Sequence, residues 1–279
     1  MKIQCIALDL DGTTLFDDDS ITQPTKEALE AAIQQGIHLV VASGRCLDAL
    51  PRCITEIEGL QYAITSNGAA VYQIQEKKCL KRFLMPAHSI EKIIHFAKPY
   101  SVAYEAFFQG KAYASGGFID DPVAYGISPD LVRYIQTTRN RVKSIEQFIL
   151  ENKEAMDNID LIVPHPEEFS ALLQDLKTHI PELYVTSSVS NRIEIAAKEA
   201  GKQNALAFLL QHLGVPREAT AAFGNADNDI EMLSYVPFGF AVENATPNCK
   251  NAAVRLVPAN TEDGVAFGIC SLIEMNGWA

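Results

Sequence analysis

Short apolar segments that alternate with helix-like segments dominate the N-terminal part of the chain. Apolar runs occupy residues 3–8, 37–42 and 62–65, and helix-like stretches at 24–35 and 47–57 lie between them. Nearly continuous apolar runs of this length are typical of strands buried on both faces of a parallel sheet. The alternation therefore predicts a doubly wound α/β fold, with a Rossmann-like parallel sheet between two layers of helices.

The same alternation returns near the C-terminus. The expected strands are 220–223 and 238–242, and the expected helices are 202–213, one from about Asp227, and one from Pro247 with Thr246 as its N-cap. These segments can extend the sheet that the N-terminal part begins. We therefore expect both ends of the chain to form one domain.

More than 130 residues separate these two halves, between Asn67 and Lys202. A structureless loop of that length is foreign to compact domains, so the segment should fold. We expect an α+β domain at 83–189, inserted into an α/β body made of 1–82 and 190–279.

The inserted segment has a sequence pattern different from that of the body. Apolar and polar residues alternate over 101–108 and 183–195, as they do in antiparallel strands with one face in water. Ser144 and Gln147 predict a capping box at the start of one helix, and 167–179 is a second helix-like stretch. This pattern is typical of an α+β domain.

Charge and composition exclude several classes of partner. The chain has 23 Lys and Arg against 35 Asp and Glu, so its formal net charge is −12. Nucleic acids and anionic membranes require a basic surface, and neither is expected as a partner. Asp9 follows too soon for a secretory leader, and no apolar run approaches the roughly 18 residues of a membrane span. We expect a cytoplasmic protein whose six cysteines are reduced thiols.

Two carboxylates follow the first predicted strand. Asp9 and Asp11 lie at its C-terminal end, where open α/β sheets bind their ligands. Such close carboxylates repel each other unless a cation or a proton lies between them, and Mg²⁺ prefers oxygen ligands. The alternative is that one Asp caps a turn while the other is a solvated loop carboxylate. The dipeptide spacing alone leaves both interpretations open.

Further motifs follow at the ends of other predicted elements. In chain order the segments are Asp9-Leu10-Asp11-Gly12-Thr13, Ser43-Gly44-Arg45, Thr65-Ser66-Asn67-Gly68-Ala69, Lys202 before Ala205-Leu206, Gly224-Asn225-Ala226-Asp227-Asn228-Asp229, and then Asn244, Lys250, Asn260 and Asp263. In this order and spacing they resemble the motifs of the haloacid dehalogenase superfamily, in particular those of its Cof-like phosphatases. The insert falls where that group carries its class IIB cap, which implies a role in substrate specificity.

The resemblance implies an aspartyl-phosphate mechanism. Asp9 would be the nucleophile, Asp11 the general acid and base, and Lys202 a catalytic cation that neutralises the charge of Asp9 and the phosphate. The implied phosphate ligands are the main-chain N–H groups of Leu10 and Gly44, the hydroxyl of Ser43, the amide of Asn228, and Lys202. The implied Mg²⁺ ligands are Asp9, Asp11, Asn225 and Asp229, with Asp227 as the alternative to Asp229. Taken alone, Ser43 and Lys202 would be ordinary strand-end and surface residues.

The chain departs from the family pattern at three positions. Asn225 stands where the group usually has an Asp metal ligand, and this change predicts weaker Mg²⁺ affinity. Gln203 and Glu243 stand where the group tends to have Gly. These departures put the level of activity in question more than the fold.

The expected function is Mg²⁺-dependent hydrolysis of a small phosphorylated metabolite, such as a sugar phosphate. The alternatives are a non-catalytic protein that binds a phosphometabolite, and a phosphotransferase or mutase. No dinucleotide or P-loop motif occurs, and we expect the six histidines to be packing or surface residues. The run 17–19 is most simply a solvated acidic loop, and the alternative is that a flap over the site begins there. Five cations of the insert could contact a substrate, although nothing distinguishes them from surface charges: Lys111, Arg133, Arg139, Arg141 and Arg192.

Overall fold

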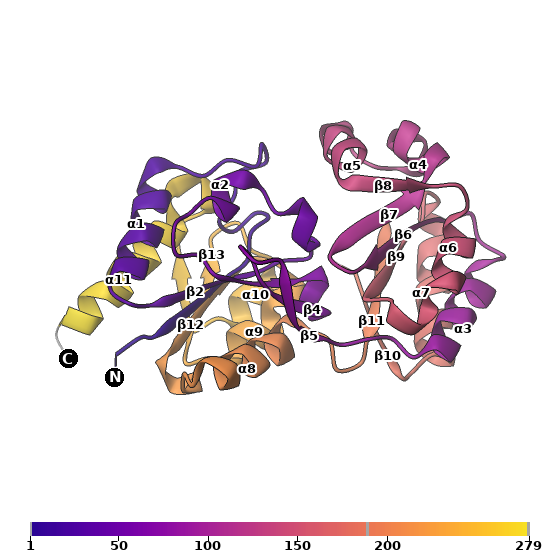
Figure 1. The fold of residues 1–279 in the computed structure, drawn as a ribbon. Coiled ribbons are helices and arrows are strands. Elements are labelled where there is room, and N and C mark those ends of the chain that lie inside the picture. Colours follow the sequence, from indigo (N-terminus) through magenta and orange to yellow (C-terminus); the bar gives the residue numbers. More distant parts are fainter. Residues whose placement is uncertain (1, 188–189, 278–279) are drawn as a thin grey trace. The chain divides into compact units, whose positions relative to one another are not determined.

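The computed structural model describes residues 2–187 and 190–277. Contacts divide the chain into two units, each shown in Figure 1. The first, called the body, holds the residues up to Lys81 and from Gly201 onward; the second, called the cap, holds Arg82–Ala200.

The body contains an eight-stranded sheet in the order β14-β13-β12-β1-β2-β3-β4-β5. Six of these strands pair in parallel, namely β1 (Cys5–Leu8), β2 (His38–Ala42), β3 (Tyr62–Thr65), β12 (Thr220–Gly224), β13 (Phe238–Val242) and β14 (Arg255–Val257). The strand β4 (Ala70–Gln73) runs antiparallel to β3, and β5 (Lys78–Arg82) lies beyond it. This sheet confirms the predicted α/β fold, with segments from both ends of the chain side by side at β1 and β12.

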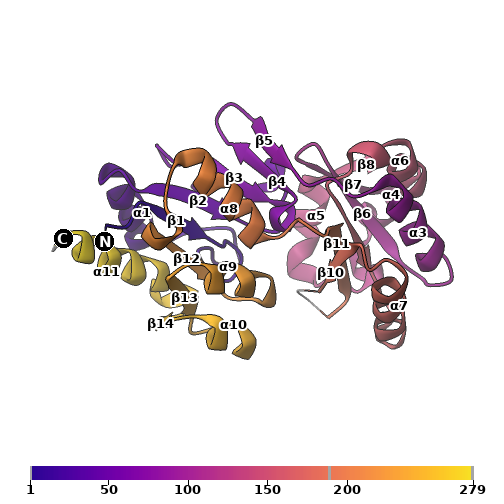
Figure 2. The same cartoon turned by 90° about the horizontal axis from the view of Figure 1, so that it is seen from below.

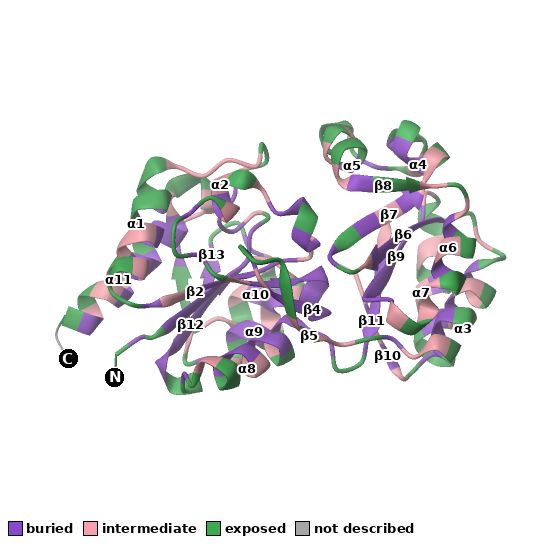
Figure 3. Cartoon of the chain, in the orientation of Figure 1, coloured by how far each residue is buried: buried purple, intermediate pink, exposed green. Residues whose placement is uncertain are grey.

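The strands β1 and β12 lie at the centre of the sheet and are buried along their whole lengths (Figure 3). Their largely apolar sequences match this environment, because each strand is covered on both faces. The aromatic rings of Phe223 and Phe240 stack with their centroids 4.7 Å apart. The loops that follow these central strands therefore start from rigid positions.

The body helices form two groups. They are α1 (Gln23–Gln34), α2 (Arg52–Thr55), α8 (Lys202–Leu213), α9 (Ile230–Tyr235), α10 (Pro247–Ala252) and α11 (Gly264–Gly277). The helix α1 packs against α11, whereas α9 packs against α8 and α10 (Figure 2). The strand order runs in opposite directions from β1, and right-handed crossovers place the two groups on opposite faces.

One predicted helix is interrupted at Pro51. The stretch 47–57 was expected to be continuous, but it forms a 3₁₀ turn at Leu47–Ala49 and then the short α2. Leu50 is extended, with ψ at 133°. A residue before proline is pushed out of the helical region, because the proline ring crowds its backbone. The predicted helix cap at Thr246 is confirmed, since its side chain accepts a hydrogen bond from the Cys249 N–H.

The cap contains a six-stranded sheet in the order β10-β11-β9-β6-β7-β8. The strands are β6 (Ala103–Phe108), β7 (Lys111–Ser115), β8 (Arg139–Val142), β9 (Asn158–Ile162), β10 (Leu183–Thr186) and β11 (Arg192–Ala197). All adjacent pairs are antiparallel except β7 and β8. This pattern matches the α+β character expected for the insert.

The cap helices pack on its sheet and on one another. They are α3 (Ala87–Ala97), α4 (Gly116–Asp120), α5 (Val132–Thr138), α6 (Ile145–Glu151) and α7 (Pro166–His179). Only half of the predicted capping box forms: the Ser144 hydroxyl accepts from the Gln147 N–H, while the Gln147 amide donates to Glu151 at 2.7 Å.

The second boundary between the units falls later in the chain than expected. Residue 189, where it was predicted, lies outside the described residues. The strand β11 follows that position and pairs with both β9 and β10 of the cap sheet. Contacts consequently assign residues up to Ala200 to the cap.

No helix among residues 2–187 and 190–277 combines the length and the apolar character needed to span a membrane. No disulfide joins cysteines in these same ranges.

Candidate active site

The ends of the central strands bring the first and fourth motifs together. Asp9 directly follows β1, and its N–H donates to the Phe223 carbonyl of β12 at 3.0 Å. The chain then turns sharply, because the Leu10 carbonyl accepts from the N–H groups of residues 13, 14 and 15. Gly12 allows this turn with a φ of +71°, a value that favours glycine. The turn leaves the Asp9 side chain buried, only 5% of the residue being exposed.

Lys202 joins two buried carboxylates. Its ammonium Nζ lies 2.7 Å from Asp9 Oδ1 and 2.7 Å from Asp229 Oδ1. Lys202 is the first residue of α8, and Asp229 ends the 3₁₀ turn after β12. Thr13 donates its hydroxyl to the second oxygen of Asp9 at 2.8 Å. The sequence-predicted residues Asp9, Lys202 and Asp229 are thus in direct contact.

The electrostatics of this trio have two opposing terms. Burial raises the pKa of Asp9, and the nearby Asp229 carboxylate raises it further, to about 7, against the opposing effect of Lys202. Burial would lower the pKa of Lys202, but the charges of Asp229 and Asp9 outweigh it and raise that pKa. Two carboxylates beside one ammonium leave the trio with excess negative charge when both are ionised. An additional cation would stabilise the ionised form of Asp9.

Asp229 is saturated with donors. Its oxygen Oδ1 accepts from Lys202, and its second oxygen Oδ2 accepts from the main-chain N–H of Asn225 at 2.9 Å and of Ala226 at 3.1 Å. Asp227 points elsewhere, since its carboxylate accepts from the Thr246 hydroxyl and from the Asn248 amide. Asp229 therefore fixes the turn that carries Asn225, and Asp227 is engaged with the start of α10.

Asp11 is turned toward Arg45 in this structure. The side chain of Asp11 is 56% exposed, and the Arg45 guanidinium donates to it from Nη2 at 2.6 Å and from Nε at 3.1 Å. Arg45 also pairs with Asp19. Arg45 belongs to one of the motifs, but no role was predicted for it, and Asp19 was expected to be a solvated loop residue. The structure joins both to the predicted acid and base.

The predicted phosphate ligands surround the same strand ends. Ser43 is fully buried after β2, and its hydroxyl accepts from the Arg45 N–H at 3.1 Å. Asn228 donates from Nδ2 to Asn67 Oδ1 at 3.0 Å. Asn67 was part of a quoted motif that carried no assigned role. The loops after β2, β3 and β12 therefore meet at this place.

Three other motif residues brace the loop after β1. Asn244 donates from its amide to the Gly12 carbonyl at 2.8 Å, and Asn260 donates to the Leu15 carbonyl at 2.8 Å. Asp263 accepts from the Thr22 hydroxyl at the start of α1. These residues hold the backbone that carries Asp9 and Asp11.

The fit of Mg²⁺ depends on oxygen donors near Asp9. The Asn225 side chain packs on the turn after β1, since a Cβ placed on Gly12 would lie 2.4 Å from Asn225 Nδ2. No group of three or more His, Cys, Asp and Glu residues that could hold a metal exists in the part of the chain that the structure describes. A carboxylate and a carboxamide are nevertheless compatible with Mg²⁺, which keeps several waters and often uses one or two carboxylates plus a substrate phosphate.

The two departures from glycine differ in their surroundings: Gln203 directly follows Lys202 of the buried trio, whereas Glu243 follows β13. Gln203 is half-buried in the first turn of α8, and Glu243 is exposed after β13. Gln203 does not interrupt α8, and Glu243 lies just beyond the end of β13.

Two of the five cations in the cap are not ordinary surface charges. Arg139 is buried and pairs with Glu105, which is itself fully buried. Arg192 lies 3.2 Å from Glu105 and 3.8 Å from Asp160. Glu105, Asp160 and Glu194 face one another across β6, β9 and β11. By contrast, Lys111, Arg133 and Arg141 are exposed.

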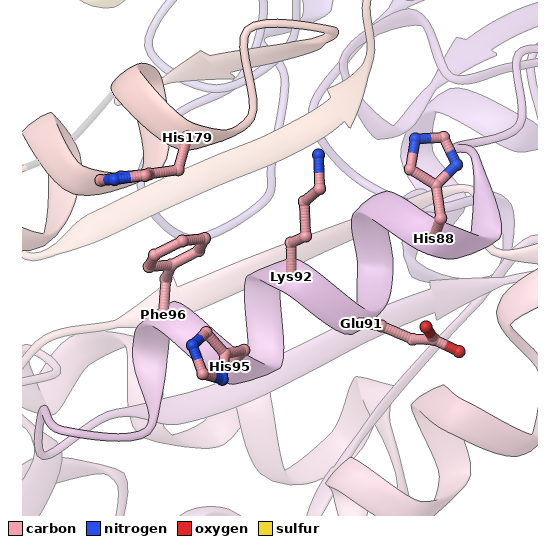
Figure 4. A pocket seen from close by; sticks show the side chains of 6 residues that line it. All are labelled: His88, Glu91, Lys92, His95, Phe96 and His179. Atoms are coloured by element: carbon pink, nitrogen blue, oxygen red, sulfur yellow. The ribbon is translucent and has the colours of Figure 1, made fainter.

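A shallow pocket on the cap gathers three of the six histidines (Figure 4). His88 and His95 come from α3, together with Lys92, and His179 ends α7. The imidazole of His179 stacks on Phe96 with ring centroids 4.3 Å apart. Lys92 donates to Glu182 at 3.0 Å. The pocket is separate in sequence and in fold from the trio in the body.

Comparisons with known proteins agree on one family. A family model described as haloacid dehalogenase-like hydrolase matches residues 6–269. The Bacillus subtilis protein YxeH is 26% identical over 96% of this chain and 97% of its own length. YitU of the same organism, a 5-amino-6-(5-phospho-D-ribitylamino)uracil phosphatase, is 26% identical over 95% and 96%. The solved structure of a haloacid dehalogenase-like hydrolase from B. subtilis superposes with a TM-score of 0.82 at 26% identity, covering 96% of this chain and 99% of that one.

Proposed function

Because the chain belongs to the haloacid dehalogenase-like hydrolases, we propose that it is a Mg²⁺-dependent phosphatase acting through an aspartyl-phosphate on Asp9. The observation that carries the proposal is the buried contact of Lys202 with both Asp9 and Asp229. Burying a lysine is costly unless its charge is paired, and here the two partners of the ammonium are Asp9 and Asp229. The named activity of YitU on a phosphorylated ribityl compound supports a phosphate ester as substrate.

The first half-reaction uses Asp9 and Asp11. A carboxylate oxygen of Asp9 attacks phosphorus, the bond from phosphorus to the ester oxygen breaks, and Asp11 gives its proton to the departing alcohol. This step requires Asp11 to leave Arg45 and turn toward the ester, since the two are paired in the structure. Lys202 remains beside Asp9 and balances the charge of the entering phosphate.

The second half-reaction returns the enzyme to its starting state. Asp11, now ionised, takes a proton from water while the water oxygen bonds to phosphorus and the bond to Asp9 breaks. Inorganic phosphate leaves, and Asp11 holds the proton for the next cycle. Ser43, Asn228 and the main-chain N–H groups of Leu10 and Gly44 would hold the phosphoryl oxygens as fixed donors.

For Mg²⁺ we propose Asp9 and Asn225 as ligands from this chain, with water and the substrate phosphate as further ligands. The other two expected ligands have different partners: Asp11 pairs with Arg45, and Asp229 accepts from Lys202 and from two main-chain N–H groups. When bound, the ion supplies positive charge that stabilises the ionised Asp9 and polarises the phosphoryl group. Asp229 supports this arrangement by holding the main-chain N–H of Asn225 and the ammonium of Lys202.

The substrate class we propose is a small phosphorylated metabolite, with a sugar or polyol phosphate as the first choice. The net charge of −12 disfavours nucleic acid and anionic membranes as partners. A small anionic substrate can still bind despite this charge, because it needs only a few local donors, and we propose that the strand-end loops supply them.

The test is a panel of phosphate esters assayed for phosphate release with and without added Mg²⁺. The wild-type chain should release phosphate only with the metal, and Asp9→Asn should reduce the release to background. Phosphate that appears on an added alcohol instead of in solution would identify a phosphotransferase. Equal activity of wild type and Asp9→Asn on every ester would refute the proposal and favour a binding protein.

A further inference from the structure

The loop after β3 has an unusual backbone. Ser66 and Asn67 have φ values of +50° and +53°, and Gly68 follows with +93°. Among the described residues other than glycine, these two are the only neighbours that both have positive φ. Positive φ is unfavourable for most residues other than glycine, and it persists only where surrounding contacts hold the backbone. The proposed chemistry gave this loop no role.

The loop is bonded to the motif after β2. The Asn67 N–H donates to the Ser43 carbonyl at 3.1 Å, and the Ser66 N–H donates to the Arg45 carbonyl at 2.9 Å. The Asn67 side chain also lies over Gly44, because a Cβ added to Gly44 would meet Asn67 Oδ1 at 3.1 Å. The position of Ser43 and Gly44 is thus tied to Asn67.

The same loop touches the start of α8. A Cβ added to Gly68 would lie 2.2 Å from the backbone of Gly201, so the two backbones are in close contact. Gly201 immediately precedes Lys202. The loop therefore also fixes where the helix bearing Lys202 begins.

Asn67 finally orients Asn228. The Asn228 amide donates to Asn67 Oδ1 at 3.0 Å. An amide nitrogen carries two N–H donors, and the second is the one that the proposed phosphate contact uses. The Asn228 carbonyl oxygen Oδ1 is buried and has no hydrogen-bond partner among the described residues. Because Asn67 accepts only from the nitrogen end of this amide, it determines which way the Asn228 side chain faces.

We propose that Asn67 is a positioning residue, which holds Asn228 and the Ser43–Gly44 loop in place beside Lys202 and so preorganises a phosphate-binding site. This inference rests on the proposed phosphatase site. The left-handed backbone of Asn67 lets its side chain lie across the strand ends. Its amide then links the loops after β2, β3 and β12. Phosphate contacts Asn228, Ser43 and Lys202, whereas Asn67 acts through them.

The first test measures binding of inorganic phosphate and of orthovanadate by calorimetry, with Mg²⁺ present. Asn67→Gly removes the side chain and keeps the backbone preference, so it should fold, and melting temperatures check this. It should weaken the binding of both anions about tenfold. Ser66→Gly is the matched control, with the same type of change one position earlier, and it should bind both as wild type does.

A double-mutant cycle with Asn228→Ala separates positioning from general support. If Asn67 acts through Asn228, then Asn228→Ala should weaken phosphate binding much less in the Asn67→Gly background than in wild type. Equal losses in both backgrounds would overturn the inference. Should Asn67→Gly not fold, Asn67→Asp replaces it, because Asp keeps an acceptor for the Asn228 amide. In the Asn67→Asp background, Asn228→Ala should retain most of its effect on phosphate binding. Loss of that effect would again overturn the inference.

Hydrolysis assays on the same proteins keep the two proposals distinguishable. Wild-type hydrolysis together with unchanged phosphate binding in Asn67→Gly overturns the positioning role and leaves the phosphatase standing. Phosphate binding that is weakened in Asn67→Gly, in a chain whose wild type hydrolyses no ester, supports the positioning role and refutes the phosphatase. A wild type that binds neither anion overturns the positioning role.

Discussion

Two nitrogens of Arg45 donate to Asp11, Nη2 at 2.6 Å and Nε at 3.1 Å, and the same guanidinium pairs with Asp19. The carboxylate proposed as acid and base is thereby drawn toward the loop after β2. In the proposed cycle Asp11 must exchange this partner for the ester oxygen. The pair therefore connects the stability of the loop after β1 with the chemistry of the site.

Asp11→Asn should slow hydrolysis according to the leaving group. An alcohol needs a proton as it departs, and general acid catalysis of that kind contributes about 10²- to 10⁴-fold. The rate with a sugar phosphate should fall by about that factor, whereas the rate with nitrophenyl phosphate should fall far less, because nitrophenolate leaves without protonation. Steady-state kinetics on both esters measure the difference. Equal losses would remove Asp11 from the acid role.

Arg45→Ala should destabilise the body by about 1–2 kcal/mol, because it removes a largely buried guanidinium together with its bonds to Asp11, Asp19 and the Ala49 carbonyl. Exposure of the two carboxylates keeps the effect below that of a buried pair. Urea-induced unfolding followed by circular dichroism measures the change. Arg52→Ala is the control, since Arg52 is exposed in α2. A similar loss in both variants would show that the Arg45 contacts contribute little.

Asn225→Asp tests the proposed metal site. A carboxylate in place of the amide adds a negative charge, so the Mg²⁺ concentration for half-maximal activity should fall by roughly tenfold. Asp227→Asn is a matched control, since Asp227 binds Thr246 and Asn248 and should leave the Mg²⁺ requirement unchanged. An unaltered requirement in Asn225→Asp would place position 225 outside the metal shell.

Sequence patterns predicted the fold well where apolar periodicity carries the information. The central strands and the helix that begins at Lys202 follow from continuous or periodic apolar residues, which reflect burial. The split helix at Pro51 and the late cap boundary were missed. The first depends on one backbone restriction, and the second depends on which sheet β11 joins, which alternation alone does not encode.

The candidate site was predictable in part. The motif residues Asp9 and Lys202 are in contact, and each lies at the end of an element whose position the fold determines. The resemblance listed Asp229 as a metal ligand, and its contact with Lys202 was not predicted. The partners of Arg45 and Asn67 were not predicted. Both act between loops from distant parts of the sequence, and only the folded arrangement brings those loops together.

The buried charges of the cap give a prediction about pH. Burial raises the pKa of Asp160 well above its usual range, and Glu194 and Glu105 add to the effect, while Arg192 opposes it. The folded chain therefore holds this proton more tightly than the unfolded chain does. The resulting stabilisation is complete below the unfolded pKa of about 3.9, and it is lost as the pH rises through the raised pKa.

Asp160→Asn removes this dependence while keeping an oxygen that can accept from Asn158 Nδ2, which now donates to Asp160 at 3.0 Å. The variant should match wild type in its free energy of unfolding near pH 4 and exceed it by about 1–2 kcal/mol near pH 8. Urea unfolding at several pH values measures the difference. Asp120→Asn is the control, because Asp120 is an exposed carboxylate paired with Arg141 and its removal should change little between these pH values. A difference between Asp160→Asn and wild type that shrinks as the pH rises would mean that Asp160 is stabilised in its ionised form by Arg192, contrary to the sign derived from its burial.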